Sequence, residues 1–327
     1  MKDTIGKVAL IQLWYEKYKK ILLVLVLILA IFVFGEITLP TGFLSIGQIL
    51  ITAKLASFTA LFGLCQMIVI AGGGEGLDLS VGYNATLTAV VTASIMNGSN
   101  GNLWLAVLVA LGFGIAIGMA NGALASYLRL PPLVVTLAMA DILQGIVNAY
   151  VAGKAITGRP SPILTLMAAK STGEFPNILF VLIPVAVLAT IAFNNTKWGQ
   201  ILFGVGANER TAYLSGINVK KVRFAAFTVS GTLASLIGLL LLGNMGIAFK
   251  DMGSNYVLPS IAAVVLGGVP LSGGGGNYLG VIMGAIFLQA LTNLLVAFGL
   301  GDAAKWVTFG IILFVMLSFY ASNVRRR

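Results

Sequence analysis

The chain has 327 residues, of which 58% are hydrophobic and only 9% are charged, and its mean hydropathy is +1.00. Soluble domains carry roughly 25% charged residues, so these few charges could not cover the surface of a soluble domain of this size. Lysine and arginine outnumber the acidic residues by 20 to 10, which gives a net charge of +10. In so apolar a chain, this excess predicts the basic cytoplasmic loops of a multi-pass membrane protein and argues against nucleic-acid binding.

The residues that are missing exclude several kinds of site. The chain has no histidine, which excludes a Ser-His-Asp triad and histidine ligands to a metal. Its single cysteine, Cys65, lies in an apolar run, and we interpret it as a small core side chain. Neither glycine-rich stretch, at residues 72–76 and 273–276, is followed by Lys-Ser/Thr, so the chain has no P-loop. We therefore expect this chain to bind no cofactor or metal, and any ATP to be hydrolysed by another subunit.

Ten apolar runs alternate with breakers along the chain, and each is a candidate membrane helix, since a span needs about 20 residues. The runs cover residues 21–39, 48–71, 81–96, 103–128, 131–151, 177–193, 223–243, 256–269, 277–300 and 303–319. The third and the eighth are short and flanked by glycine clusters, which indicates broken or re-entrant helices. The sequence thus predicts an all-α polytopic membrane protein with about ten transmembrane helices.

The basic residues predict the orientation of these spans. With the N-terminus inside, 14 of the 20 lysines and arginines fall in cytoplasmic segments and six fall on the opposite side. Both termini are then cytoplasmic, which requires an even number of spans. Residues 1–20 form a cytoplasmic N-terminal segment, residues 21–320 the transmembrane domain, and residues 321–327 a basic cytoplasmic tail.

Two loops in this topology are long. Residues 152–176 face outward and form a candidate docking surface, whereas residues 194–222 face the cytoplasm. In the cytoplasmic loop, Asn208 can cap a short helix, Glu209 suits the positive end of that helix, and Gly216 can end it. A second helix start follows at Asn218. The pattern fits a helical hairpin that contacts a cytoplasmic partner, and it equally fits a solvated loop with basic anchors.

Polar side chains at membrane depth are candidates for function. Asp141 lies midway along residues 131–151, and Gln144 and Asn148 follow it on the same helix face. Such a face lines a passage for a hydroxylated solute or joins two helices by hydrogen bonds. Further polar candidates on other spans are Asn121, Gln289 and Asn293.

Glycines recur every fourth residue at positions 114, 118 and 122 and again at 276, 280 and 284. Small residues at this spacing allow helix backbones to approach closely in lipid, so we interpret both stripes as packing surfaces. Between the second and third spans, Asp78 and Ser80 are placed to cap the helix that starts near Val81.

Four motifs in order carry a family resemblance. Residues 76–82, Gly-Leu-Asp-Leu-Ser-Val-Gly, include Asp78, Ser80 and Gly82 and resemble the signature after the second span in permease subunits of bacterial ribose/galactose-type ABC importers. Residues 131–138, Pro-Pro-Leu-Val-Val-Thr-Leu-Ala, are similar to a second motif of that family. Residues 204–208 with 212–219 resemble its cytoplasmic coupling segment. Residues 266–274, Leu-Gly-Gly-Val-Pro-Leu-Ser-Gly-Gly, are similar to the fourth motif.

The resemblance implies a permease in the bacterial cytoplasmic membrane that pairs with a second permease chain, identical or different, around a central pathway. A cytoplasmic ABC ATPase that uses ATP and Mg²⁺ would drive it, and an extracytoplasmic binding protein would deliver a monosaccharide or related solute. The ATPase would receive a coupling helix whose residues include Asn208, Glu209, Ala212, Tyr213, Leu214, Gly216 and Ile217. Gln144 and Gln200 stand where arginine is frequent in the family, which leaves the solute open.

Two other classes of function fit the residues less well. A secondary transporter coupled to an ion gradient would be supported by Asp141, but such carriers usually have several ionisable groups within the membrane. An intramembrane enzyme is the weakest alternative, because the chain has no histidine, no paired carboxylates and no metal-ligand cluster.

Overall fold

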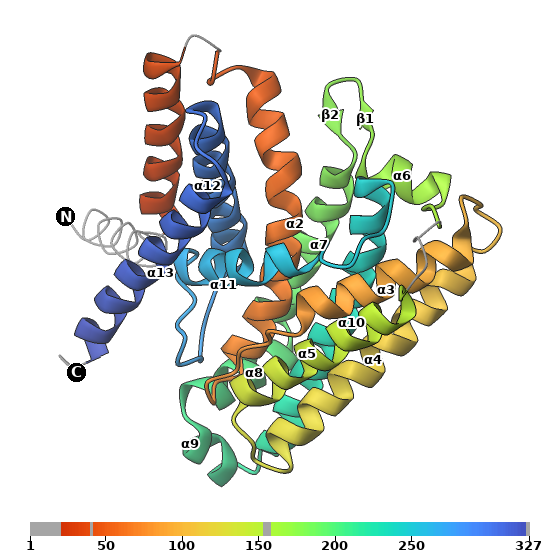
Figure 1. Cartoon of the computed structure of the whole chain (residues 1–327). Helices are drawn as coiled ribbons and strands as arrows, with labels where there is room; N and C mark the ends of the chain where they lie inside the picture. The colour runs from red at the N-terminus through yellow and green to blue at the C-terminus, as the bar shows by residue number, and fades with distance from the viewer. Residues whose placement is uncertain (1–20, 40–41, 153–157, 325–327) are drawn as a thin grey trace, which may run out of the picture.

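The computed structural model describes residues 21–39, 42–152 and 158–324, and these residues are almost entirely α-helical (Figure 1). The predicted N-terminal segment, residues 1–20, and the last three residues of the predicted tail lie outside the described residues. Within the described part, seven helices are long and apolar enough to cross a membrane. They are Ile21–Thr38, α2 (Ile46–Ala71), α4 (Leu103–Ser126), α5 (Pro132–Tyr150), α7 (Ile178–Asn195), α10 (Val219–Met245) and α12 (Tyr278–Ala297). A multi-pass helical membrane protein is confirmed, whereas ten spans and cytoplasmic termini stay predictions.

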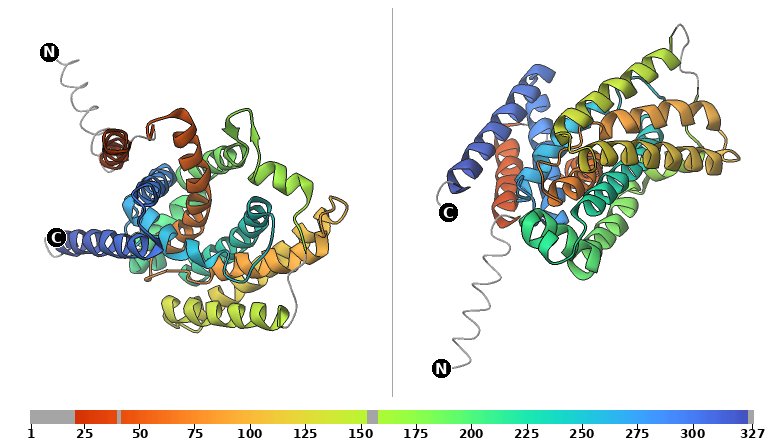
Figure 2. Two further views of the ribbon diagram at one scale, coloured as in Figure 1. Left: turned by 45° about the horizontal axis from the view of Figure 1, so that its top comes forward. Right: turned by 90° about the horizontal axis from the view of Figure 1, so that it is seen from below.

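Two apolar helices are too short to cross a membrane, as the glycine clusters beside them predicted. Helix α3 (Val81–Met96) has 16 residues, and α11 (Val257–Leu266) has 10 and follows the short 3₁₀ helix η1 (Ser254–Tyr256). At 1.5 Å per residue these helices are about 24 and 15 Å long, well short of a hydrocarbon core of about 30 Å. The remaining apolar helix, α13 (Asp302–Val324), contacts α11 and α12 and extends away from the other helices (Figure 2).

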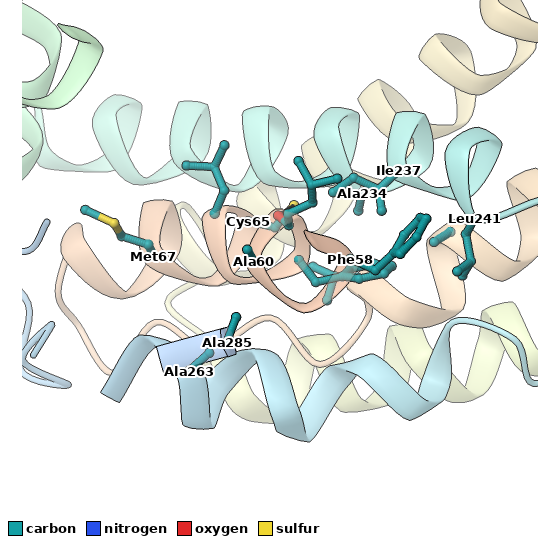
Figure 3. Close-up of a cluster of buried hydrophobic side chains, with 14 of the residues drawn as sticks. Phe58, Ala60, Cys65, Met67, Ala234, Ile237, Leu241, Ala263 and Ala285 are labelled. Atoms are coloured by element: carbon teal, nitrogen blue, oxygen red, sulfur yellow. Dashed lines mark hydrogen bonds between the residues drawn. The ribbon is translucent and has the colours of Figure 1, made fainter. Parts of the chain in front are cut away.

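Helix α2 lies at the centre of the core, and most of its side chains are buried. Figure 3 shows Phe58, Cys65 and Met67 of α2 between α10 on one side and α11 and α12 on the other. Cys65 is a free and fully buried cysteine, which confirms its interpretation as a core side chain.

The predicted glycine stripes pack helices against each other, except that Gly276 of the second stripe lies in the loop before α12. A Cβ atom added to Gly118 of α4 would lie 2.6 Å from the carbonyl oxygen of Phe227 on α10, and Gly114 and Gly122 face the same helix. Gly280 and Gly284 of α12 lie against the backbone of α11 at Gly267 and Ala263. Both helix pairs therefore depend on contacts that any side chain would block.

The two long loops have folded parts at opposite ends of the molecule (Figure 1). The loop predicted to face outward contains α6 (Pro162–Ala168) and an antiparallel hairpin of β1 (Ser171–Thr172) and β2 (Phe175–Pro176). Lys54 of α2 donates a hydrogen bond to the carbonyl of Ala169 and so holds the end of α6 against the bundle. The loop predicted to be cytoplasmic contains α8 (Lys197–Ala207) and α9 (Glu209–Leu214). Helix α8 was not expected from the sequence.

Candidate functional site

The polar residues of α5 lie on one face, as their spacing predicted. Asp141 and Asn148 are exposed and Gln144 is half-buried, while the neighbouring face of α5, which carries Ala140, Leu143 and Val147, packs into the protein. The Nε2 atom of Gln144 donates to Oδ1 of Asp251 over 3.4 Å. Sequence reasoning missed Asp251 because it lies in the short segment between α10 and η1, which appeared to be a connecting loop. The structure thus brings two carboxylates and two amides to the same side of α5.

An exposed carboxylate midway along a membrane helix restricts what can cover this face. Asp141 at the centre of a span would cost about 2.5–3.5 kcal/mol in contact with hydrocarbon. This face of α5 therefore meets water or another polar protein surface. Asp251 and Gln144 extend the polar area beside it.

The predicted pair on α12 divides between two environments. Gln289 donates to Oδ1 of Asn293 over 2.8 Å, and Asn293 donates to Oγ1 of the buried Thr52 on α2 over 2.9 Å. Asn293 thus joins α12 to α2. Gln289 also lines a cavity of about 230 Å³, together with Thr292 of the same helix and three polar groups from other helices: Thr59, Asn255 and Lys305. A passage role for Gln289 and Asn293 stays a prediction, and the cavity favours it only for Gln289.

Asp78 and Ser80 form a buried network at the break between α2 and α3. Oδ1 of Asp78 accepts hydrogen bonds from the backbone N–H of Ser80 over 3.0 Å and from its hydroxyl over 2.6 Å. Oδ2 of Asp78 accepts from the Ser230 hydroxyl on α10, and the Ser80 hydroxyl accepts from Nδ2 of Asn121 on α4. Gln66 of α2 binds both the backbone N–H and the carbonyl of Asp78. The motif therefore fixes the break to three helices.

This network bears on the predicted roles of Ser80 as a helix cap and of Asn121 in the passage. The Ser80 side chain makes no capping hydrogen bond to α3, because its hydroxyl is already bonded to Asp78. Asn121 is fully buried in the network, so here it joins α4 to the α2–α3 break, and its predicted place in the passage stays a prediction. Gly82 contacts the backbone of Gly253, where any side chain would collide.

The helical hairpin predicted within residues 194–222 is present, with the expected caps. Oδ1 of Asn208 accepts from the N–H of Thr211 over 2.9 Å at the start of α9. Gly216 ends the helix with a φ of +81°, a left-handed conformation that glycine adopts without a Cβ clash. The N–H of Ile217 then bonds back to the carbonyl of Ala212. Asn218 caps α10 through the N–H of Lys221.

The predicted ATPase contacts on α9 differ in exposure, and their contact with a partner stays a prediction. Tyr213 and Leu214 are 71% and 76% exposed, which is unusual for large apolar side chains on so short a helix. Ala212, another predicted contact, is only 5% exposed and packs against Val205 of α8 and Val219 of α10. Ala212 holds the hairpin together, because its small side chain fills the space between three helices.

Comparisons with known proteins show the family of the chain. The family model described as "branched-chain amino acid transport system / permease component" matches residues 45–317. The ribose import permease protein RbsC of Escherichia coli K12 is 30% identical over 96% of this chain and 95% of its own length. The galactose/methyl galactoside import permease protein MglC of the same organism is 29% identical over 96% and 97%. The autoinducer 2 import system permease protein LsrC of Yersinia enterocolitica is 30% identical over 81% and 75%. No solved structure matches the chain significantly.

Proposed function

This chain belongs to the family of the branched-chain amino acid transport system permease components, and we propose that it is the membrane subunit of an ATP-driven importer for a monosaccharide or a related hydroxylated solute. The relatives named for import of ribose, galactose or methyl galactoside, and autoinducer 2 support this class of solute. As a multi-pass permease, the chain lies in the bacterial inner membrane and acts as a transport component and not as an enzyme.

The polar face of α5 carries the proposal for the pathway. Carboxylate oxygens of Asp141 and Asp251 accept hydrogen bonds from sugar hydroxyls, and the amides of Gln144 and Asn148 both donate and accept. Because Asp141 is exposed midway along an apolar helix, the face needs a polar cover. A second permease chain, identical or different, would provide that cover on the far side of a shared water-filled pathway.

The hairpin of α8 and α9 is the proposed contact with a cytoplasmic ABC ATPase. Tyr213 and Leu214 present an apolar surface outside the predicted spans, and aromatic side chains are frequent anchors at protein interfaces. The sequence has no P-loop, so ATP and Mg²⁺ would be used by that partner. On the opposite side, α6 and the β1–β2 hairpin offer a folded surface for a solute-binding protein.

Purification of the tagged chain from membranes of its native host tests the proposal. We expect a P-loop ATPase to co-purify in mild detergent, and we expect the reconstituted complex to import sugar only with ATP and a loaded binding protein. An ion-coupled secondary transporter is the alternative, since Asp141 and Asp251 place two carboxylates on the proposed pathway. Sugar uptake by the chain alone, driven by an ion gradient and abolished by an ionophore, would overturn the ABC assignment.

A further inference from the structure

We propose that three glycine-containing loops form a backbone junction that transmits movement from the cytoplasmic hairpin to the transmembrane helices, and that Arg223 is the positioning residue that closes it. This inference rests on the proposed function. The loops are residues 71–76 at the C-terminal end of α2, residues 206–209 at the turn where α8 ends and α9 begins, and residues 272–276 before α12. We call them together the glycine junction.

The three loops touch through their backbones. The N–H of Gly274 donates to the carbonyl of Ala71 over 3.0 Å. A Cβ atom on Gly206 would overlap both the Ala71 carbonyl oxygen and the Gly274 nitrogen. A Cβ atom on Gly273 would lie 2.6 Å from the Cα atom of Gly73. Since no side chain separates these backbones, a displacement of one loop must move the other two.

Arg223 joins the hairpin to the first of these loops. Its Nη2 atom lies 2.9 Å from Oε2 of Glu209, the first residue of α9, and its Nε atom donates to the Gly72 carbonyl over 3.2 Å. A Cβ atom on Gly74 would lie 2.7 Å from the guanidinium carbon, so the loop covers the arginine closely. A 420 Å³ cavity borders these groups and leaves room for the contact to change.

The conformation of the first loop shows that its surroundings hold it in place. Gly73 and Gly74 have φ values of +70° and +67°, and Glu75 continues the left-handed path at +56°. A non-glycine residue adopts that conformation at a cost, and it persists where neighbouring contacts impose it. The contacts in this case come from the hairpin, through Gly206, and from Arg223.

The connections beyond the junction lead into the bundle. The first loop continues into Asp78 and Ser80, which are bonded to α4 and α10. Residues 272–276 lead into α12, which packs on α2 and α11. On the other side, the same hairpin exposes Tyr213 and Leu214. A movement of α9 that the ATPase drives would therefore be transmitted through direct contacts to the ends of α2, α3 and α12.

Two pairs of substitutions test the junction in the complete complex with its ATPase and binding protein. Gly206→Ala would force the loops apart, whereas Gly204→Ala on the same helix is the matched control, because nothing lies within 4 Å of its added Cβ. Arg223→Ala removes both the ion pair and the bond to Gly72. Its control, Asp302→Asn, removes the ion pair with Lys305 outside the junction.

For Gly206→Ala and Arg223→Ala we expect normal assembly and basal ATP hydrolysis, but a roughly 2- to 30-fold loss in solute imported per ATP hydrolysed, the range of 0.5–2 kcal/mol for a mutated coupling route. Arg223→Lys keeps the charge and should recover part of the ratio. Both controls should match wild type. A wild-type complex without an ATPase would refute the proposed function itself. A working wild-type complex would refute the junction alone if both variants keep the normal ratio, or if both lose only assembly.

Discussion

At the scale of single residues, the informative side chains are those whose polarity does not match their surroundings. Asp141 is charged and exposed on an apolar helix, and Tyr213 and Leu214 are apolar and exposed on a short loop helix. In the isolated chain, contact of Asp141 with lipid and contact of Tyr213 and Leu214 with water each cost free energy. Such residues point to partners absent from a single chain. Periodicity alone predicted the first case, because Asp141, Gln144 and Asn148 share a face in any regular helix.

The role of Asp141 can be tested by two substitutions of similar size. Asp141→Leu removes charge and hydrogen bonding, and it should lower uptake roughly 10- to 150-fold, the equivalent of a hydrogen bond to a charged group. Asp141→Asn keeps hydrogen bonding, so we expect partial activity. Uptake of radiolabelled sugar, normalised to the amount of permease in the membrane, measures both. If both variants transport like wild type, Asp141 does not line the passage.

At the scale of helices, the sequence predicted where helices begin and end better than it predicted the contacts between them. Asn208, Gly216 and Asn218 identified the limits of α9 and the start of α10, because caps depend only on neighbouring backbone groups. Helix α8 was missed, since its three glycines are poor helix formers and its buried side chains pack against other elements. The burial of Ala212 was also missed, because it depends on Val205 and Val219 from two other helices.

The helix pair of α4 and α10 gives a test of the packing stripe. Gly118→Val would place a branched side chain against the Phe227 carbonyl, where a Cβ alone would already be 2.6 Å away. We expect overpacking to destabilise the protein by about 1–3 kcal/mol or more. The control is Gly112→Val on the same helix, whose added Cβ meets nothing within 4 Å. The midpoint of thermal unfolding in detergent compares the two, and equal midpoints would contradict the packing role.

The exposed apolar pair on α9 gives a second test. Tyr213→Ser with Leu214→Ser should leave the hairpin folded, because neither side chain is buried in this chain. The substitution should still weaken ATPase binding by about 2–4 kcal/mol if these are interface anchors, which is roughly 30-fold or more. Ala212→Arg should instead disrupt the hairpin, since Arg exceeds the space between Val205 and Val219. Co-purification of the ATPase measures the first effect, and protease sensitivity of the loop separates it from the second. Unchanged ATPase recovery with the double variant would remove α9 from the interface.

At the scale of the whole molecule, composition was sufficient to predict a polytopic helical bundle but not its arrangement. The glycine stripes predicted close packing, yet they did not identify α10 as the partner of α4, because the two are more than ninety residues apart in the sequence. Likewise, the two glycine-rich loops before α3 and α12 share a residue pattern, but only the fold reveals that they touch. Long-range pairing of this kind depends on the three-dimensional path of the chain, which no single segment encodes.

The orientation of the whole chain in the membrane can also be tested. The excess of basic residues predicts that residues 194–222 face the cytoplasm, and Ser215 is exposed at the end of α9 within this loop. Ser215→Cys in a Cys65→Ala background offers a single thiol there. The native cysteine is fully buried in the core, so its replacement by alanine removes little volume and no surface group. A membrane-impermeant maleimide should label Ser215→Cys in inside-out vesicles but not in intact cells. Glu174→Cys, in the exposed turn between β1 and β2, should show the reverse pattern. Labelling of Ser215→Cys from outside intact cells would show that the predicted topology is inverted. The proposed ATPase contact would then lie on the wrong side of the membrane.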